Sequence, residues 1–557
     1  MRNAGRLLLP IGTTNYKKIC DNYYYVDKTL MIKDILDEGT EISLFTRPRR
    51  FGKTLNMDML RTFFEKQEED TSRYFTDKKI WQQGEAYTKH QGKYPVIYLS
   101  LKDANKLTWS DLYARLIETI RDEFFRHSEL NNSPKISNPE FYKKIIAGQA
   151  TEAEYSISIL RLSRMLREHY GQSVILMIDE YDTPIQAGYI NGFYNEAIQF
   201  IRDLFSSALK DNDNLAFGFL TGILRVAKES IFSGLNNIYV YSVLDDKFSD
   251  YFGFTDVEVK QLVHYYALDD KLAEIKEWYD GYRFGEVEIY NPWSVLSYLK
   301  NGCRAIPYWV QTSSNSTINT ILRNLDGETY QKLKDIINGK AISSIVSTNV
   351  IYPELKDRSA NIFGFLLMTG YLKSSRTNFT MRGNILCELC IPNKEIENVY
   401  YNEILSQLAD GVSINTTNVL SEALLHKDDV LLKQSLNKFL LETISFYDTL
   451  NENYYHGLLL GMTVIFAHDY YIYSNRESGL GRYDIMLVPK QAGLPGIVIE
   501  VKSTDKSSSA ALKALASRAL AQINTNKYDA ELVKQGVKLI YKYGIAFSGK
   551  QAEIMTN

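Results

Sequence analysis

The chain has 557 residues, of which 45% are hydrophobic and 24% charged, the composition of an ordinary globular protein of about two to four domains. No apolar stretch approaches the roughly 18 residues of a membrane-spanning helix, and the first apolar run stops at Pro10, so we expect no membrane anchor and no signal peptide, and we predict a cytoplasmic protein. The formal net charge of −3 gives no overall sign of a nucleic-acid partner.

Residues 44–54, LFTRPRRFGKT, end in Gly52-Lys53-Thr54, as a phosphate-binding loop does. The preceding EISLFT predicts a buried strand, and the following TLNMDMLRTFFEK has apolar side chains at helical spacing. In this strand–loop–helix context, backbone N–H groups at the start of the helix face the β- and γ-phosphates of a nucleotide. Lys53 would neutralise the phosphate charge, and the Thr54 hydroxyl would bind Mg²⁺.

The beginning of this loop departs from the usual pattern. A phosphate-binding loop carries a glycine five residues before Gly52, where this chain has Arg47. Because Pro48 restricts Arg47 to extended conformations, we expect the loop to follow a different path. We also expect Arg47, Arg49 and Arg50 to add positive charge around the phosphates. The predicted ATP-binding loop comprises Arg49, Arg50, Phe51, Gly52, Lys53 and Thr54.

The segment SVILMIDEYD runs from a buried strand into two acidic residues, Asp179 and Glu180. A fully apolar run of this kind is typical of a central parallel strand, whose carboxyl end faces the ligand crevice of an α/β sheet. There Asp179 would hold Mg²⁺ through water, and Glu180 would orient or deprotonate the attacking water. An ordinary strand followed by an acidic turn is the alternative.

Two further runs, YPVIYLSL and LAFGFLTGIL, predict buried strands of the same sheet. The second ends in a polar residue, Thr221, which could sense the γ-phosphate. Arg225 follows and could stabilise charge in the same chain or in a neighbouring subunit. A threonine in a strand is otherwise a common strand former.

Several long motifs of this half carry a resemblance. The segments YVDKTLMI, LFTRPRRFGKTLNM, MIDEYDTPI, LTGILRVAKESIFSGLNN and YDGYRFG…YNPWSVL resemble the predicted AAA-ATPase-like proteins, which are mostly bacterial and carry a nuclease-like C-terminal domain. The loop of that family reads RPRRFGK, so Arg47 resembles a family trait. The resemblance implies a P-loop ATPase domain with a parallel sheet flanked by helices, and ATP and Mg²⁺ as cofactors.

A second candidate site lies near the C-terminus. YDIMLVP and IVIEVKS predict two strands joined by the turn KQAGLPG. Side chains alternate along a strand, so Glu500 and Lys502 share a face that Asp484 can meet from the partner strand. A divalent cation, Mg²⁺ or Mn²⁺, would compensate these carboxylates, with oxygen ligands from Asp484, Glu500 and the Val501 carbonyl. The alternative is an exposed hairpin with a surface salt bridge.

This pattern resembles the PD-(D/E)xK nuclease superfamily, with an α/β restriction-endonuclease-like fold. The resemblance implies that Lys502 positions a metal-activated water for attack on a phosphodiester. It also implies a helix after the second strand, which SSSAALKALASRALAQINTNKY supplies, with Gln522 as its polar residue at the site. An earlier helix offers Glu452, whereas His456 is interpreted as structural. After residue 500 there are nine Lys or Arg against four Asp or Glu, a local basic surface that could attract a nucleic acid. A solvated Lys-rich face is the alternative, which charge alone does not exclude.

The predicted domains are a P-loop domain at 1–285, a helical connecting region at 286–440 with a winged helix as one interpretation, and a nuclease-like domain at 441–557. ETYQKLKDIINGK and NIFGFLLMTGYL are the helical patterns of the middle. The two cysteines of CELC, without a second pair at zinc-like spacing, predict reduced thiols.

Three hypotheses follow for the function. The first is an ATPase coupled to a metal-dependent nuclease that acts on DNA. The second is a nucleotide-dependent switch whose nuclease-like domain holds nucleic acid without cutting it, and the third is an interaction protein with neither activity. The third hypothesis is disfavoured by the presence of all the expected site residues: Lys53, Asp179, Glu180, Asp484, Glu500 and Lys502. A homo-oligomer is left open.

Overall fold

The computed structural model describes residues 6–226, 237–309, 339–350, 352–356, 359–400, 414–443, 452–463, 469–474, 477–479, 481–505 and 508–557, with single positions between 329 and 336 and Phe466. The chain divides into two compact units, Met1–Glu397 and Asn398–Asn557, and the division falls inside the region 286–440. Within the described residues, no helix combines the length and the apolar composition that crossing a membrane requires.

The first unit contains most of the helices. They are α1 (Tyr16–Asn22), α2 (Leu30–Glu38), α3 (Lys53–Phe64), α4 (Glu85–Thr88), α5 (Trp109–Arg126), α6 (Pro139–Ile146), α7 (Glu152–Ser156), α8 (Ser158–Tyr170), α9 (Thr183–Asn191), α10 (Tyr194–Leu209), α11 (Asp256–Tyr265), α12 (Leu272–Tyr279), α13 (Pro292–Lys300) and α16 (Ser359–Met368). Short 3₁₀ helices span Thr71–Tyr74, Trp81–Gln83, Ser128–Asn132, Asp269–Lys271 and Tyr352–Lys356.

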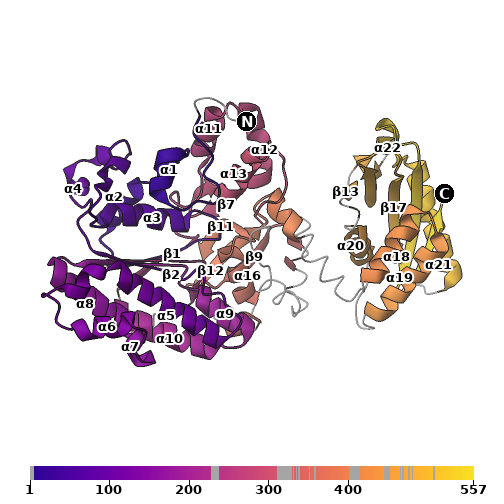
Figure 1. The fold of residues 1–557 in the computed structure, drawn as a ribbon. Coiled ribbons are helices and arrows are strands. Elements are labelled where there is room, and N and C mark those ends of the chain that lie inside the picture. Colours follow the sequence, from indigo (N-terminus) through magenta and orange to yellow (C-terminus); the bar gives the residue numbers. More distant parts are fainter. Residues whose placement is uncertain are drawn as a thin grey trace. The chain divides into compact units, whose positions relative to one another are not determined.

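The main sheet of this unit has the order β2-β3-β4-β1-β6, and every neighbouring pair is parallel. Its strands are β2 (Val96–Ser100), β3 (Val174–Asp179), β4 (Leu215–Gly222), β1 (Ile42–Thr46) and β6 (Ile238–Tyr241). Helices α1 to α4 lie on one face and α5 to α10 on the other (Figure 1). Because both faces are covered, β1 and β3 are buried throughout, which explains their unbroken apolar runs.

The sheet places three strand ends together. Strand β4 lies between β1, which leads into the GKT loop, and β3, which ends at Asp179. This confirms the predicted parallel sheet flanked by helices. The strands predicted from EISLFT, YPVIYLSL, SVILMID and LAFGFLTG are β1, β2, β3 and β4.

The described part of the middle region contains helices, as predicted, and in addition a small sheet. Its order is β11 (Lys373–Phe379), β12 (Ile385–Cys390) and β9 (Ile342–Val346), all antiparallel. The other short strands of the unit are β5 (Arg225–Val226), β7 (Tyr282–Phe284), β8 (Val287–Ile289) and β10 (Asn349–Val350). NIFGFLLMTGYL corresponds to α16, whereas about half of ETYQKLKDIINGK lies outside the described residues. Cys387 and Cys390 are free thiols on β12.

The second unit contains a mixed sheet of order β13-β16-β17-β18-β19, consistent with the nuclease-like prediction. Its strands are β13 (Tyr470–Ser474), β16 (Ile485–Pro489), β17 (Gly496–Ser503), β18 (Ile540–Ser548) and β19 (Gln551–Thr556), with β14 (Glu477–Ser478) and β15 (Gly481–Arg482) as a separate pair. Its helices are α18 (Ile414–Leu425), α19 (Asp429–Thr443), α20 (Glu452–Thr463), α21 (Ser509–Thr525) and α22 (Ala530–Lys534). Strand β19 was not expected from the sequence.

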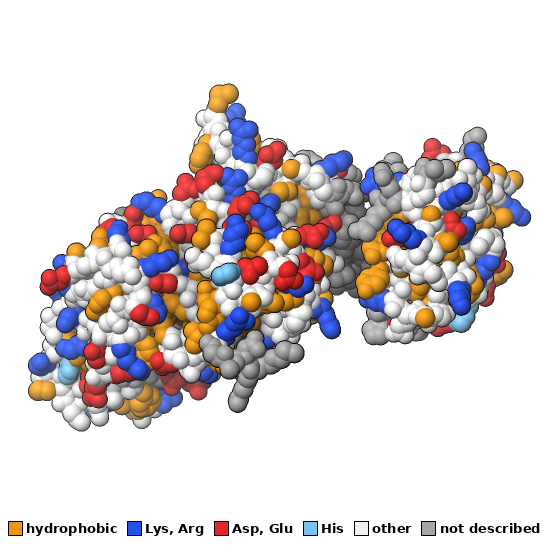
Figure 2. Space-filling view, turned by 90° about the horizontal axis from the view of Figure 1, so that it is seen from above, with side chains coloured by type: hydrophobic (Ala, Val, Ile, Leu, Met, Phe, Trp, Pro, Cys, Tyr) orange, Lys and Arg blue, Asp and Glu red, His pale blue; other side chains and the backbone are white. Residues whose placement is uncertain are grey.

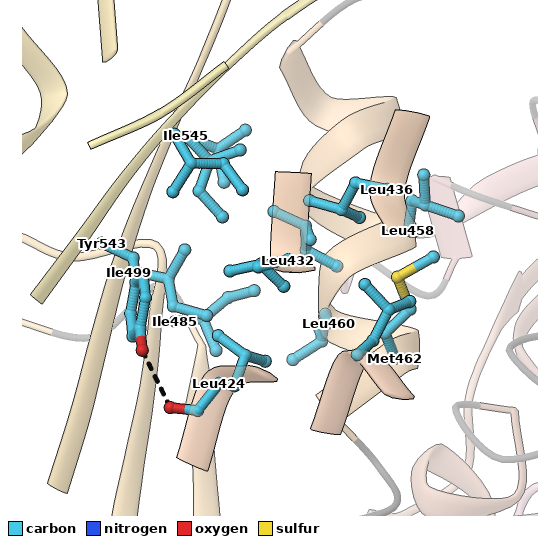
Figure 3. Packing of buried hydrophobic residues seen from close by; sticks show 14 of the residues in the cluster. Leu424, Leu432, Leu436, Leu458, Leu460, Met462, Ile485, Ile499, Tyr543 and Ile545 are labelled. Atoms are coloured by element: carbon cyan, nitrogen blue, oxygen red, sulfur yellow. Dashed lines mark hydrogen bonds between the residues drawn. The ribbon is translucent and has the colours of Figure 1, made fainter. Parts of the chain in front are cut away.

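Strands β16 and β17 form the predicted antiparallel hairpin, and α21 connects β17 to its parallel neighbour β18. One face of this sheet packs against α18, α19 and α20 through aliphatic side chains such as Leu432, Leu458 and Ile499 (Figure 3). In the same core the Tyr543 hydroxyl donates a hydrogen bond to the Leu424 carbonyl (2.8 Å). This core fixes the hairpin on which the second candidate site is built.

Candidate active sites

The GKT loop turns with two residues in the left-handed region, Arg50 (φ 71°) and Gly52 (φ 85°). Gly52 caps α3, so the helix begins at Lys53 and its first N–H groups face the loop. The Lys53 ammonium donates to the carbonyls of Arg47 (2.9 Å) and Pro48 (2.8 Å). Lys53 is buried, and burial lowers its pKa.

Arg47 does not line the phosphate site, which corrects the expectation that all three arginines would add charge there. Its side chain is 0% exposed. The guanidinium donates to the carbonyls of Thr46 (2.9 Å), Tyr241 (2.7 Å) and Phe248 (3.2 Å). It also lies 5.1 Å and 5.2 Å from two phenylalanine ring centres. Arg47 therefore braces the start of the loop against β6 and the segment that follows it.

Asp179 connects the three strand ends. Its Oδ2 accepts a hydrogen bond from the Thr54 hydroxyl (2.8 Å), and its Oδ1 accepts one from the Thr221 hydroxyl. Thr54 lies in the first turn of α3 and Thr221 lies near the end of β4, so the carboxylate joins residues that are far apart in sequence. The backbone N–H of Glu180 completes the group, because it donates to Thr221 Oγ1 (3.4 Å).

Glu180 adopts a left-handed backbone (φ 55°), which is uncommon for a residue with a side chain and is found more often at functional sites. Burial raises the pKa of its carboxyl group. Asp182 lies close by, and its Oδ2 accepts from the backbone N–H groups of Ile223 (2.9 Å) and Leu224 (3.0 Å). Burial also raises the pKa of Asp182. Sequence reasoning missed Asp182, although it belongs to the same acidic run.

One cavity of about 470 Å³ lies beside this loop. Its lining includes the loop from Arg49 to Thr54, together with Glu180 and Asp182. Residues 10–14 and apolar side chains from several elements also line it, among them Tyr24, Leu262, Trp293 and Leu296. Sequence reasoning did not find these further lining residues, because they lie in separate segments without a motif.

Arg225 lies apart from this cavity. It lines a different one of about 330 Å³, together with Thr46 and residues of the small antiparallel sheet. Its Nε is buried and has no hydrogen-bond partner. Arg49, by contrast, lines the larger cavity and donates to Gln186 Oε1 (3.0 Å). Of the predicted ATP-site residues, the structure thus brings together those of the loop, Asp179 and Thr221, but not Arg225.

The second site is built on the β16–β17 hairpin. Asp484 precedes β16, and its Oδ2 accepts a hydrogen bond from the Val501 N–H (2.7 Å). Burial raises the pKa of Asp484, and the Val501 N–H opposes this rise. The His456 ring contacts the Asp484 carbonyl (3.1 Å) and the Ser474 hydroxyl (3.0 Å), in keeping with the structural role predicted for it.

Glu500 is the centre of this site. It is 1% exposed, and its Oε1 accepts from Lys502 Nζ (3.0 Å) and Gln522 Nε2 (2.5 Å), whereas its Oε2 is buried without a partner. Burial, together with the neighbouring Asp484, raises the pKa of Glu500 to about 7. Burial lowers the pKa of Lys502, but the hydrogen bond to Glu500 and the charges of the neighbouring carboxylates together outweigh burial, so the pKa of Lys502 is raised overall.

Two further residues join this site. Glu452 at the start of α20 accepts from Lys502 Nζ and the Ser503 N–H, both at 3.4 Å. The Tyr528 hydroxyl accepts from Gln522 Nε2 (3.1 Å) and so holds the amide at the site. Tyr528 was not found from the sequence, because a tyrosine after a helix carries no recognisable signal.

The donors fit a divalent cation. The buried Glu500 and the half-buried Asp484 interact electrostatically, and Glu500 Oε2 has no hydrogen-bond partner. Hard oxygen atoms are the ligands of Mg²⁺ and Mn²⁺. Among the described residues, no cluster of three or more His, Cys, Asp or Glu side chains has the arrangement of a metal centre. The fit therefore depends on two carboxylates and on the backbone carbonyl of Val501.

Comparison with known proteins matches each of the two units to a family. Residues 10–232 match the family described as Predicted AAA-ATPase, and residues 450–557 match the PD-(D/E)XK nuclease superfamily. The chain combines an AAA-ATPase-like domain with a PD-(D/E)XK nuclease superfamily domain. Over 489 residues it is 26% identical to a protein of Azotobacter chroococcum mcd 1 named "Uncharacterized protein in vnfD 5'region", a match that covers 86% of this chain and 81% of that protein. The resemblance found in the sequence motifs is thereby confirmed.

Proposed function

We propose that the AAA-ATPase-like domain binds and hydrolyses Mg²⁺–ATP, and that the nuclease superfamily domain cleaves phosphodiester bonds in DNA. The observation that carries the first part is the Asp179 carboxylate, which accepts from both Thr54 and Thr221. A carboxylate shared by the start of the loop helix and the end of the central strand is placed to bind a cation and to respond to a γ-phosphate.

In this proposal the β- and γ-phosphates lie at the N-terminus of α3. Lys53 exchanges its bonds to the loop carbonyls for bonds to phosphate oxygens, while Arg49 and Arg50 add charge from the rim. The cation, when bound, neutralises phosphate charge, and Thr54 and Asp179 are the residues that would hold it. Apolar side chains of the cavity lining, such as Tyr24, Trp293 and Leu296, accommodate the base.

Glu180 is the proposed general base of hydrolysis. It lines the same cavity as Lys53, and its pKa, raised by burial, brings it closer to the pKa range in which a carboxylate accepts a proton effectively. Thr221 is the proposed γ-phosphate sensor. The role of Arg225 stays a prediction, because its side chain lines the separate cavity.

In the nuclease domain, Asp484, Glu500 and the Val501 carbonyl would hold a divalent cation, which when bound would supply a nucleophilic water and stabilise developing negative charge. Lys502 would hold that water through its ammonium and orient it towards the phosphate. Gln522 fixes the rotamer of Glu500 by donating to Oε1. These roles agree with the superfamily to which residues 450–557 belong.

A nucleic-acid substrate is supported by the local charge of the C-terminal segment. Nine Lys or Arg against four Asp or Glu follow residue 500. On the face drawn in Figure 2, Lys and Arg side chains are interspersed with Asp and Glu over the larger unit, so attraction of a polyanion depends on a local surface. DNA as substrate, a cytoplasmic location and a homo-oligomer stay predictions from the sequence.

The experiment measures cleavage of linear, nicked and branched DNA with Mn²⁺, with and without ATP, beside ATP binding and phosphate release. Lys53→Ala removes the ammonium at the loop, with Lys79→Ala, which changes an exposed lysine, as its control. We expect ATP binding to be lost only in Lys53→Ala. Unchanged affinity in that variant would reject the nucleotide site.

Asp484→Ala tests the nuclease site, with Asp429→Ala as an exposed control in the same unit. We expect metal-dependent cleavage to disappear in Asp484→Ala and to persist in the control. Cleavage that survives in Asp484→Ala would place the activity elsewhere. ATP turnover without any cleavage by the wild-type protein would favour a nucleotide-driven switch.

A further inference from the structure

Glu395 is a buried carboxylate that neither proposed site uses. It lies in the helical stretch that begins at residue 394 and is 0% exposed. The Ser294 hydroxyl donates to its Oε1 (3.0 Å) and Oε2 (2.8 Å), and the Trp309 N–H donates to Oε1 (2.8 Å). Within the described residues, no lysine, arginine or histidine forms an ion pair with it. In the absence of a counter-cation, these hydrogen bonds compensate the loss of hydration of the buried carboxyl group.

Both donors belong to segments that contact the phosphate-binding loop. The Trp309 indole N–H donates to the Arg49 carbonyl (3.2 Å). Trp293 directly precedes Ser294, and the Arg50 guanidinium lies over its ring, 4.5 Å from the ring centre. Through one side chain, Glu395 therefore ties together the two tryptophan segments that contact consecutive residues of the loop.

The same part of the fold covers the loop further. The Trp309 ring packs edge-on against Tyr371, with ring centres 4.9 Å apart. At Gly370 an added Cβ would lie 3.0 Å from Pro48 Cβ, so the chain passes close to the loop there. Pro48, Arg49 and Arg50 are thus each contacted by this part of the fold, so a shift of either tryptophan would move their contacts with the loop.

We propose that Glu395 is a positioning residue of the phosphate-binding loop, acting through Ser294 and Trp309 on the two tryptophans that hold Arg49 and Arg50. Its consequence for ATP affinity rests on the proposed nucleotide binding, whereas its effect on the loop itself does not. The middle region thereby becomes part of the nucleotide site, although it lies outside the matched residues 10–232.

The first test is hydrogen–deuterium exchange of peptides that cover residues 47–54 in the nucleotide-free protein. Glu395→Ala removes the acceptor, and we expect the loop amides to exchange at least about fivefold faster. Glu123→Ala is the matched control, because Glu123 is equally a buried glutamate but is bound by Arg126 and Tyr98. Unchanged exchange of the loop in a folded Glu395→Ala protein would overturn the proposal.

The second test measures the dissociation constant of Mg²⁺–ATP. Trp309→Phe keeps an aromatic ring but removes the donor to Arg49, and we expect both it and Glu395→Ala to weaken binding by at least about fivefold, the lower range of couplings between sites. If Glu395 acts through Trp309, the double variant binds no more weakly than the weaker single variant. Effects that simply multiply would contradict the proposed route.

Conservative variants test whether the hydrogen bonds of Glu395 position the loop. Glu395→Gln retains an oxygen that can accept from the Trp309 N–H, so we expect nearly wild-type exchange and affinity in this variant. A loss of affinity as large as that in Glu395→Ala would refute positioning by hydrogen bonding. If Glu395→Ala does not fold, Trp309→Phe and Ser294→Ala carry the same exchange test. Faster loop exchange in a chain whose wild type binds no ATP would support the positioning role and reject the proposed nucleotide binding.

Discussion

Replacing Arg47 tests whether the hydrogen bonds of its buried guanidinium stabilise the start of the loop. In Arg47→Met, the carbonyls of Thr46, Tyr241 and Phe248 lose their donor. Each unsatisfied carbonyl costs about 1–3 kcal/mol. Removing the buried charge returns several kcal/mol of desolvation energy. We therefore expect a net loss of about 2–4 kcal/mol in the free energy of unfolding of the first unit.

Arg47→Lys separates charge from geometry. Burial lowers the pKa of Arg47 to about 9, so the guanidinium stays protonated at neutral pH. A lysine retains the charge, but its single ammonium cannot reproduce the fork that reaches several carbonyls. We expect this variant to lose about 1.5–3 kcal/mol, the cost of one hydrogen bond that involves a charged group.

The assay is urea unfolding followed by tryptophan fluorescence of the full chain. All five tryptophans lie before residue 310, so the signal reports only the first unit. With a slope of about 3 kcal/mol per molar urea, a loss of 3 kcal/mol lowers the midpoint by about 1 M. Arg49→Met is the matched control, because its side chain is half-exposed at the cavity. An Arg47→Met midpoint equal to that of the wild type would refute the bracing role.

Four other predictions concern single side chains. Glu180→Gln should bind ATP like the wild type but release phosphate at least about 10²-fold more slowly. Turnover within a few-fold of the wild-type rate would assign the role of general base to another residue. Gln522→Leu frees the buried carboxylate of the nuclease site, so cleavage should fall by about 10–100-fold in a DNA assay while the melting temperature holds; full activity would contradict its role. Gly544→Ala would place a Cβ 2.3 Å from a carbonyl oxygen of α21. Thermal unfolding followed by circular dichroism should therefore show a loss of about 1–3 kcal/mol in the free energy of unfolding. An unchanged melting curve would mean that α21 shifts away at no cost. Burial raises the pKa of Glu395 from 4.5 to about 7, so the folded state keeps this proton to a higher pH than the unfolded state does. The free energy of unfolding should therefore fall as pH rises between about 5 and 7. Glu395→Gln should lack this part of the pH dependence in urea unfolding, and a pH profile identical to that of the wild type would refute the shift.

The sequence determined the parts whose physical cause is local. Fully apolar runs predicted β1 and β3, because a strand covered on both faces has no polar positions. The GKT loop was predicted from residues that a helix start and a phosphate both require. The spacing of Glu500 and Lys502 placed both side chains on one face of a strand, and the structure brings them to 3.0 Å.

The tertiary structure decided what depends on contacts between distant segments. The sequence assigned Arg47 to the phosphates, whereas its guanidinium lies beneath the loop, because carbonyls of Tyr241 and Phe248 come within reach only in the folded sheet. The partners of Asp179 and of Glu395 are likewise separated by tens of residues or more along the chain. A buried polar group must find its partners wherever the fold brings them, and no local pattern in the sequence records which residues those will be.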